Sequence, residues 1–304
     1  MSQKHVVINL DKPKGLSSQQ AVTTVKKIWN VKKAGHAGTL DPLACGILLV
    51  CLSEATKITR FLSDLDKEYL AVMKLGEKTD TLDSEGELIR TVRDFSIRSE
   101  EIEEVLRRFS GTIQQTPPMY SALKRSGMPL YKLARRKIAV VRPEREVQIH
   151  SIEMTGFNLP FVEIKVSCSK GTYVRTLCDD IGEALGVGAH ITALKRTRVG
   201  DFFINNAVSI EGLEEVLQHY PSMSTIPSVL TINDALKHLP ALTLTESECR
   251  SARNGIPFRY RSEYHCISEG FLRLNDPLGN LFAIGRLLEG IIKIERIFHL
   301  SEKS

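Results

Sequence analysis

The sequence predicts a protein of mixed helices and strands, divided into a large N-terminal part and a small C-terminal part. Short apolar runs typical of buried strands alternate with segments of helical periodicity over roughly the first 200 residues. Ser, Thr and Pro then accumulate between Pro221 and Pro240, which indicates a domain boundary. Beyond it, short strands are separated by the turn sequences DPLGN and EG. This last pattern is typical of a small β-domain.

The first elements of the chain are predicted to be a strand, a helix and two further strands. HVVINL predicts a strand, and DKPKG the turn that follows it. Ser17 and Gln20 have the spacing of a capping box, so a helix is expected to begin there. Its apolar face consists of Ala21, Val22, Val25, Ile28 and Trp29. GILLVCL predicts a short buried strand, and EYLAVMKL a second strand with partial alternation.

The middle of the chain is predicted to hold two more helices around an irregular segment. Ser99 is expected to cap a helix that runs through Phe109 and stops at Gly111. TPPMYSALKRSGMPL is expected to lack regular structure, because each proline removes a backbone donor. REVQIHSIEMTGF and FVEIKVSCSKG predict paired strands, followed by a helix from Thr172 to Leu185.

Composition and length favour an intracellular globular protein. The 304 residues are enough to bury one large domain or two. The longest apolar run, from Ala44 to Leu52, is half of what a membrane span needs, and the first ten residues lack the layout of a signal peptide. No CxxC pair occurs, so free thiols in a reducing cytosol are expected for Cys45, Cys51, Cys168, Cys178, Cys249 and Cys266. We therefore expect a cytoplasmic protein that does not interact with membranes.

Basic residues are concentrated in one segment. The chain has a net charge of +5, whereas residues 107–145 alone carry ten basic residues against one acid, Glu144. This island also contains Tyr120 and Tyr131. A solvated basic surface would explain a single helix of this kind, but an island of this size favours a polyanionic partner such as nucleic acid.

Asp41 is the first candidate for chemistry, in the sequence GHAGTLDPLACGILL. From local sequence, two interpretations stay open: Asp41 is the N-cap of a helix that has Pro42 at its first position, or it is a reactive carboxylate. His36 lacks a second histidine three to five residues away, so no metal site is predicted. In SKGTYVRT, Arg175 lies in the first turn of a predicted helix, where the helix dipole disfavours a cation. Arg175 therefore either forms an ion pair at the surface or binds a carboxylate in a functional site. Tyr69, taken by itself, is consistent with an aromatic residue of the core.

Four stretches in order along residues 5 to about 200 resemble one family. They are GHAGTLDPLACGILLVCLSEATKITRFL, DKEYLAVMKLGEKTDTLDSEG, PPMYSALKRSGMPLYKLAR and SKGTYVRTLCDDIGEALGVGAHITALKR. Together they resemble TruB-type tRNA pseudouridine-55 synthases, and the remainder is similar to the small RNA-binding domain, called PUA, that follows in bacterial members. Ala37 and Cys45 stand where threonine is common in the family, and neither position has a chemical role.

The resemblance implies an α+β fold. A pseudouridine synthase catalytic domain, residues 1–236, would contain an extended mixed, largely antiparallel sheet and a basic RNA-binding insertion at about 107–145. A small β-barrel-like PUA domain would follow at 237–304. The implied reaction converts uridine to pseudouridine at position 55 in the T-loop of tRNA. It neither gains nor loses atoms, so no cofactor, nucleotide or metal is expected.

The resemblance also implies roles at single positions. Asp41 would be the nucleophile, attacking either C1′ of the sugar or C6 of the base. Arg175 would pair with Asp41 and keep it ionised. Tyr69 would stack on the uracil and help remove the C5 proton, and Leu194 would line the apolar side of the pocket. His36 would occupy the space left when the target base is flipped out.

The remaining implied contacts are with RNA. The expected RNA-binding residues are His36, Tyr173, Lys12, Lys14, Lys67, Lys124, Arg125, Lys132, Arg135 and Arg136. Asp179 and Asp180 are expected to be helix-surface charges. The expected partner is the T-arm stem-loop of tRNA, bound by a monomer without guide RNA or obligate protein partner. Two alternatives are a non-catalytic RNA-binding or RNA-folding protein and a guide-RNA-dependent synthase of the dyskerin type, which the lack of lysine-rich tails disfavours.

Overall fold

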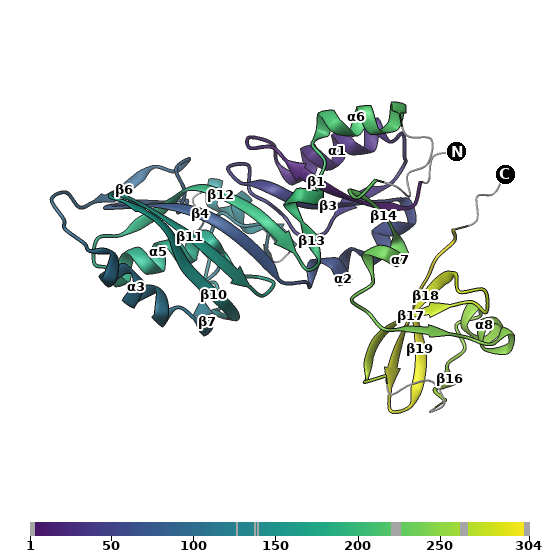
Figure 1. The fold of residues 1–304 in the computed structure, drawn as a ribbon. Coiled ribbons are helices and arrows are strands. Elements are labelled where there is room, and N and C mark those ends of the chain that lie inside the picture. Colours follow the sequence, from purple (N-terminus) through teal and green to yellow (C-terminus); the bar gives the residue numbers. More distant parts are fainter. Residues whose placement is uncertain are drawn as a thin grey trace.

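The computed structural model describes residues 4–125, 127–136, 138, 140–219, 226–261 and 267–300 (Figure 1). The predictions made for Lys137 and Cys266, and for residues 220–225 of the expected boundary, lie outside the described residues. The five described cysteines are all free. No helix in these ranges is long and apolar enough to cross a membrane.

One extended sheet dominates the N-terminal part of the protein. Its strands are β1 (Val6–Lys12), β2 (Ala34–His36), β3 (Cys45–Leu52), β4 (Lys67–Leu75), β7 (Gly111–Gln115), β10 (Arg145–Asn158), β11 (Phe161–Cys168), β12 (Ala189–Val199), β13 (Phe202–Phe203) and β14 (Val229–Thr231). The spatial order is β14-β1-β3-β12-β4-β11-β10-β7, with β13 paired to β12 and β2 paired to β3. Among the described strands of this sheet, only β3 and β12 pair in parallel. The predicted α+β class with a mixed, largely antiparallel sheet is therefore confirmed.

Helices cover the two ends of this sheet. The longer ones are α1 (Ser18–Ile28), α3 (Ser99–Arg108), α5 (Val174–Ala184) and α6 (Ile210–His219). Figure 1 shows α1 and α6 together over the end formed by β1 and β3, whereas α3 and α5 lie against the other end. The predicted capping box of α1 is present, because the Ser17 hydroxyl accepts from the Gln20 amide and the Gln20 side chain accepts from the Ser17 amide.

Short elements connect the larger ones. They are η1 (Ser53–Ile58), α2 (Thr59–Ser63), β5 (Glu77–Thr79), β6 (Leu88–Thr91), β8 (Lys124–Arg125), β9 (Met128–Pro129), α4 (Leu130–Arg135), η2 (Ile204–Asn206) and α7 (Ile232–Ala235). β5 pairs with β6, and β8 pairs with β9. The β5–β6 hairpin matters for the site, because the loop between its strands carries Asp83.

The C-terminal part is a curled sheet with one helix. Its elements are β15 (Ala241–Thr243), α8 (Glu246–Arg253), β16 (Phe258–Arg259), β17 (Gly270–Asn275), β18 (Leu281–Leu288) and β19 (Ile291–Ile297). The described strands have the order β15-β17-β18-β19-β16 and lie beside α2 and α7 (Figure 1). Leu281, Ile284 and Phe298 share one apolar cluster with Ile58 and Phe61 of the N-terminal part. The two parts therefore have a continuous core where they meet.

Three predictions about local structure were wrong. Helix α3 begins at Ser99 with Arg98 as its N-cap, because Glu101 reaches back to the Arg98 amide and Ser99 is already inside the first turn. Helix α5 begins at Val174, two residues after the expected start. The segment TPPMYSALKRSGMPL contains the short β8–β9 pair and the start of α4, because Pro129 occupies a strand end and then precedes a helix.

The basic island is not one insertion. Residues 107 and 108 belong to α3, and β7 pairs with β10 as part of the extended sheet. Only residues 116–144 lie between β7 and β10, and we refer to them as the insertion.

Candidate active site

Asp41 lies in a turn between β2 and β3, and no helix begins there. The Ala44 amide donates to the Asp41 carbonyl at 3.1 Å, and β3 starts at the next residue. The predicted N-cap role is therefore wrong: the apolar residues after Pro42 enter a strand that is almost completely buried, and this burial outweighs the local preference for a helix. The Ser18 hydroxyl fixes the turn from α1, donating to the Leu40 carbonyl and accepting from the Leu40 amide at 2.8 Å each.

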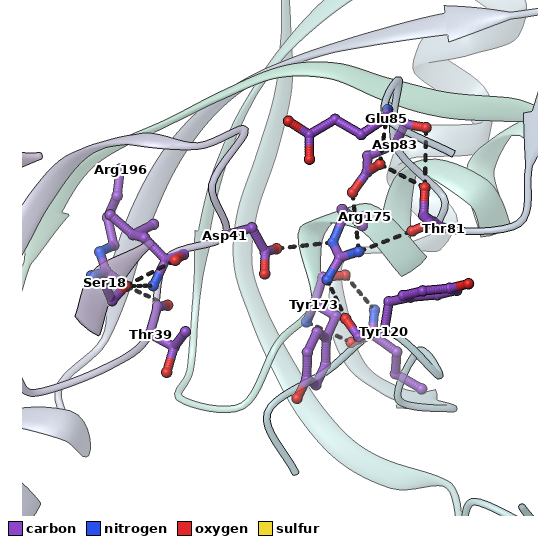
Figure 2. Close-up of polar contacts among 12 residues, drawn as sticks. Ser18, Thr39, Asp41, Thr81, Asp83, Glu85, Tyr120, Tyr173, Arg175 and Arg196 are labelled. Carbon is purple, nitrogen blue, oxygen red and sulfur yellow. Dashed lines mark hydrogen bonds and ion pairs between the residues drawn. The ribbon is translucent and has the colours of Figure 1, made fainter. Parts of the chain in front are cut away.

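Arg175 faces Asp41 across the site. Its Nε lies 2.9 Å from Oδ2 of Asp41 (Figure 2). The arginine side chain is only 5% exposed, whereas that of Asp41 keeps 35% of its surface exposed. The guanidinium is thus fixed inside the protein, and the carboxylate remains accessible beside it. The prediction that Arg175 is near Asp41 agrees with this geometry.

The other nitrogens of Arg175 are held by groups that the sequence did not indicate. Nη1 donates to the Thr81 carbonyl at 2.9 Å and lies 3.2 Å from Oδ2 of Asp83, and Nη2 donates to the Tyr120 carbonyl at 2.7 Å. Asp83 is itself fixed, because its Oδ1 accepts from the Thr81 hydroxyl and the Glu85 amide. Figure 2 shows the guanidinium between two carboxylates, with Asp41 on one side and Asp83 on the other.

The start of α5 is anchored by a side chain from the sheet edge. Tyr173 is the N-cap residue, but its side chain makes no capping hydrogen bond. Gln115, at the end of β7, replaces this cap with two bonds: its Oε1 accepts from the Tyr173 amide at 2.7 Å and its Nε2 donates to the Tyr173 carbonyl at 3.0 Å. Because Gln115 is only 2% exposed, the first turn that carries Arg175 is rigidly attached to the sheet.

A cavity of about 310 Å³ opens above Asp41. Its walls include the predicted residues Tyr69, Leu194, Tyr173 and Arg175. Tyr69 comes from β4 and Leu194 from β12, both 8% exposed or less. Residues 121–123 of the insertion close one side of the same cavity. The cavity therefore combines one accessible carboxylate, aromatic and apolar walls, and a direct connection to the basic insertion.

Burial dominates the ionisation of these groups. It raises the pKa of Asp41, which Arg175 opposes and the like charge of Asp83 reinforces. It also raises the pKa of Tyr69, against the effect of the neighbouring Arg196 guanidinium. Burial and Arg196 lower the pKa of His36, which favours its neutral form. Arg175 was expected to keep Asp41 ionised, and it does lower the Asp41 pKa, but burial and Asp83 outweigh this effect.

The predicted phosphate contacts separate into two groups. Lys12 and Lys67 are buried, and Lys67 lines the cavity, so a phosphate contact by either lysine stays a prediction. The Lys12 amine donates to the carbonyls of Pro13 and Leu16, and the Lys67 amine to those of Ser63 and Leu65. Burial lowers the pKa of each lysine to about 8. Through these hydrogen bonds the two lysines brace the turns around the cavity, whereas Lys14 is exposed at the surface.

The predicted RNA contacts in the insertion are at the surface. All five predicted RNA contacts in this segment are exposed, and we call them the insertion cations: Lys124, Arg125, Lys132, Arg135 and Arg136. None of them lines the cavity, whereas residues 121–123 immediately before them do. This places a positive surface next to the opening, as a polyanionic substrate would require.

Asp179 is not a simple helix-surface charge, whereas its neighbour Asp180 is half-buried. Asp179 is buried and forms an ion pair with Lys78 at 2.8 Å. Lys78 also pairs with Glu183, which in turn pairs with Arg90. This network ties the β5–β6 hairpin, and with it Asp83, to helix α5. Within the described ranges, no group of three His, Cys, Asp or Glu side chains is placed to hold a metal ion.

Sequence reasoning missed Asp83, Arg196 and Gln115. Asp83 is one of several acids in TDTLDSEGE, and nothing in their spacing distinguishes it. Arg196 lies beside Lys195 in a strand, where basic side chains are commonly exposed. A signal for Gln115 exists only in the fold, because its partner is 58 residues away.

Comparison with known proteins identifies the family. Residues 26–174 match the model of the TruB family pseudouridylate synthase N-terminal domain, and residues 175–235 match the tRNA pseudouridylate synthase B C-terminal domain. The chain is 43% identical to tRNA pseudouridine synthase B of Pseudomonas aeruginosa, over 93% of this chain and 92% of that protein. It is also 43% identical to the Haemophilus influenzae protein of the same name, over 84% and 82% of the two chains.

Solved structures agree with this assignment. A Cbf5-Nop10-Gar1 complex contains a chain that is 27% identical, with a TM-score of 0.75 over 97% of this chain and 85% of that chain. An H/ACA RNP bound to a substrate RNA containing 2′-deoxyuridine gives a TM-score of 0.74 at 25% identity, over 97% and 86% of the chains. With relatives of this identity along nearly its whole length, the chain belongs to the TruB family of pseudouridylate synthases.

Proposed function

We propose that the protein isomerises uridine 55 in the T-loop of tRNA, with Asp41 as the nucleophile. Conversion of uridine to pseudouridine in tRNA is the activity of the family to which the chain belongs. The position in tRNA and the roles of individual residues are our proposal. The observation that carries it is a single accessible carboxylate, paired with a buried arginine, at the base of a cavity beside an exposed basic surface.

The reaction breaks the bond between N1 of the base and C1′ of the ribose and forms a bond between C5 and C1′. Asp41 would attack either C1′ or C6 and leave again, so it is regenerated. The C5 proton is lost and N1 gains a proton, so the composition of the nucleotide is unchanged. Tyr69, in the cavity wall, would stack on the uracil, and its hydroxyl would relay the C5 proton, accepting it on oxygen while its own proton passes on toward N1. Leu194 would contact the apolar edge of the base.

A uridine inside a folded T-loop must be turned out before it can reach Asp41. His36 comes from β2, next to the Asp41 turn, and the low pKa that favours its neutral form suits a residue that fills the space vacated by the base. Tyr173, at the start of α5, is a second aromatic wall for the flipped nucleotide. The insertion cations and Lys14 would bind phosphates of the T-arm.

We further propose that the protein acts in the cytoplasm as a monomer, without guide RNA or protein partner. The residues 237–304 would be an RNA-binding domain that contacts tRNA outside the T-loop. A guide-dependent synthase is the specific alternative, because two of the similar solved structures are RNA–protein assemblies or complexes with further subunits. A non-catalytic RNA-binding protein is the second alternative.

Tritium release from tRNA labelled at C5 of uridine distinguishes these possibilities. We expect purified protein alone to release tritium from a T-arm stem-loop and to place pseudouridine at position 55. Release only after addition of guide RNA or other subunits would support the dyskerin-type alternative, and binding without release would support the non-catalytic one.

Asp41→Asn tests the nucleophile directly. The amide keeps the size of the carboxylate, so we expect unchanged folding, a Kd for tRNA within about threefold of wild type, and no detectable pseudouridine, because an amide is a poor nucleophile. Asp94→Asn, at an exposed position outside the cavity, is the matched control and should remain fully active. Pseudouridine formation by Asp41→Asn at a near wild-type rate would disprove the assignment.

A further inference from the structure

Arg196 is the largest completely buried polar side chain near the site, and the function described above gives it no role. It is 1% exposed, and it lies in β12, between β3 and β4 in the sheet. Its register partner on β4 is Tyr69, and its register partner on β3 is Gly46. The strand order therefore places this arginine between the wall of the cavity and the strand that follows the Asp41 turn.

The guanidinium of Arg196 binds the backbone at both ends of the Asp41 turn. Nε donates to the Ile47 carbonyl at 2.7 Å, after the turn, and Nη2 donates to the Gly38 carbonyl at 3.0 Å, before it. Nη1 is 3.5 Å from the Thr39 carbonyl. Three bonds from one planar group to carbonyls on either side of Asp41 fix the shape of the turn, since a planar fork allows little rotation.

Arg196 also faces the other side of the cavity, because Arg196 and Tyr69 are register partners that both line it, and the guanidinium opposes the rise that burial causes in the Tyr69 pKa. The group that holds the Asp41 turn is therefore also the one that acts on the Tyr69 phenol. Figure 2 shows Arg196 and Thr39 on one side of Asp41, with Arg175 on the opposite side. Asp41 is consequently fixed from two directions: Arg175 holds its carboxylate, and Arg196 holds the backbone of the turn before and after it.

Arg196 is not there to neutralise a carboxylate. Among the described residues, no Asp or Glu forms an ion pair with it, and the acids of the site pair with Arg175 instead. A buried guanidinium without a counter-charge is costly unless its donors are satisfied, and backbone carbonyl oxygens accept from them here. An apolar side chain at position 196 would fill the interior of the sheet at a lower cost in desolvation free energy. The presence of arginine there therefore indicates a need for a donor that reaches several acceptors at once.

We propose that Arg196 is a positioning residue of the isomerase, which ties the Asp41 turn to the Tyr69 hydroxyl and so fixes the nucleophile and the phenol oxygen relative to each other. The proposal rests on the function proposed above, in which both groups act on the same uracil. Gly46 is part of the arrangement: its φ of +98° is left-handed, and a Cβ there would lie 2.3 Å from the Arg196 carbonyl oxygen. The close approach of β3 to β12 keeps the turn within reach of the guanidinium.

Arg196→Lys is the central test, because lysine keeps the charge but loses the planar fork. We expect kcat for tRNA to fall by about tenfold or more, whereas KM and the Kd for tRNA stay within about threefold, because the groups that bind RNA are unchanged. Arg198→Lys is the matched control: Arg198 lies on the same strand and donates to the Gly200 carbonyl and the Ser167 hydroxyl, away from the cavity. Its kcat should stay within about twofold of wild type.

The coupling to Tyr69 separates positioning from a purely structural role. In a Tyr69→Phe background, measured in single-turnover reactions, Arg196→Lys should cost clearly less than in the wild type, because one of the two groups that it connects has lost its oxygen. Thermal melting of each variant identifies a folding defect, and the lysine variant is conservative enough to fold even if Arg196→Met does not.

Three results would overturn the proposal. They are a kcat of Arg196→Lys within about twofold of wild type, a loss confined to KM, and equal losses in the wild-type and Tyr69→Phe backgrounds. These outcomes differ from a failure of the proposed function, in which the wild-type protein itself would form no pseudouridine or Asp41→Asn would remain active.

Discussion

Asp83→Asn should show how much of the activity depends on the second carboxylate of the Arg175 site. Oδ2 of Asp83 lies 3.2 Å from Nη1 of Arg175, and the two side chains are 7% and 5% exposed. Asparagine has the same shape and keeps an oxygen for the Thr81 hydroxyl, so the loop should fold as before. The substitution removes the negative charge that fixes the guanidinium on the side away from Asp41.

The magnitude follows from the distance and burial of this pair. A buried hydrogen bond to a charged group contributes about 1.5 to 3 kcal/mol. If the whole contribution serves to hold Arg175 against Asp41 in the transition state, kcat should fall by about 12- to 160-fold. The carbonyls of Thr81 and Tyr120 still bind two of the guanidinium nitrogens, so Arg175 should stay inside the protein with a less exact position, and tRNA affinity should change little.

The same substitution should change the pH dependence in a defined direction. The charge of Asp83 contributes to the raised pKa of Asp41, so its removal lowers that pKa. Because the proposed nucleophile is the ionised carboxylate, the loss of activity on acidification should begin at lower pH in Asp83→Asn than in the wild type.

Tritium release at saturating tRNA, measured between about pH 5 and 8, gives both quantities. Glu85→Gln is the control, since it removes one negative charge from an exposed position two residues along the same loop. An Asp83→Asn variant with kcat within about twofold of wild type and an unshifted acid limb would refute the argument that Asp83 acts through Arg175.

Three other variants test the surface, the interface and the helix. Replacing the insertion cations with glutamine should weaken tRNA binding and reduce the dependence of log Kd on log salt by about 0.7 to 0.9 for each phosphate that is no longer bound, whereas an unchanged slope would remove them from the interface. Truncation after Leu239 should lower the Tm, because Leu281, Ile284 and Phe298 each contribute about 1.5 to 3 kcal/mol through their burial in the shared cluster. The kcat on an isolated T-arm, measured at low temperature, should be retained. An unchanged Tm would show that the two parts are independent. Burial raises the pKa of Asp180 to about 6, so the folded state favours the protonated form of this residue, and the stability of the protein declines as pH rises from about 4 to 6. Asp180→Asn should therefore raise the Tm by about 2 to 4 °C at pH 7.5 but not below pH 4. Equal changes in Tm at both pH values would contradict this prediction.

The sequence predicted the elements whose signals are local. The Ser17 capping box and the continuous apolar run of β3 each involve residues that are close together in the chain, so short-range rules describe them well. Asp41 and Arg175 were also predicted, although through family motifs, since neither residue is distinctive by local chemistry. The direct contact between them spans more than a hundred residues and depends on the sheet order.

The predictions that were wrong share one physical cause: which residues are buried depends on tertiary structure and not on the local sequence. Asp41 has good N-cap chemistry, but the residues after it gain more by entering β3. Lys12 and Lys67 counted as surface charge, yet both are buried with their amines on backbone carbonyls. Composition cannot distinguish a lysine that binds phosphate from one that braces a turn, because both uses require the same donor.

The balance of charge around Asp41 explains why a lone acid is placed in basic surroundings. Among the described residues that act on the site, Asp41 and Asp83 are the acids, whereas Arg175, Arg196 and the two buried lysines are basic. Burial raises the pKa of the Asp41 carboxylate, and the neighbouring Arg175 and Lys12 oppose that effect before any substrate arrives. Because both lysines have a pKa of about 8, they remain largely charged at neutral pH, and the excess of positive charge would favour the phosphates of the proposed RNA substrate. A second free carboxylate at the cavity would repel those phosphates, and Asp83 avoids this effect because it is buried behind Arg175.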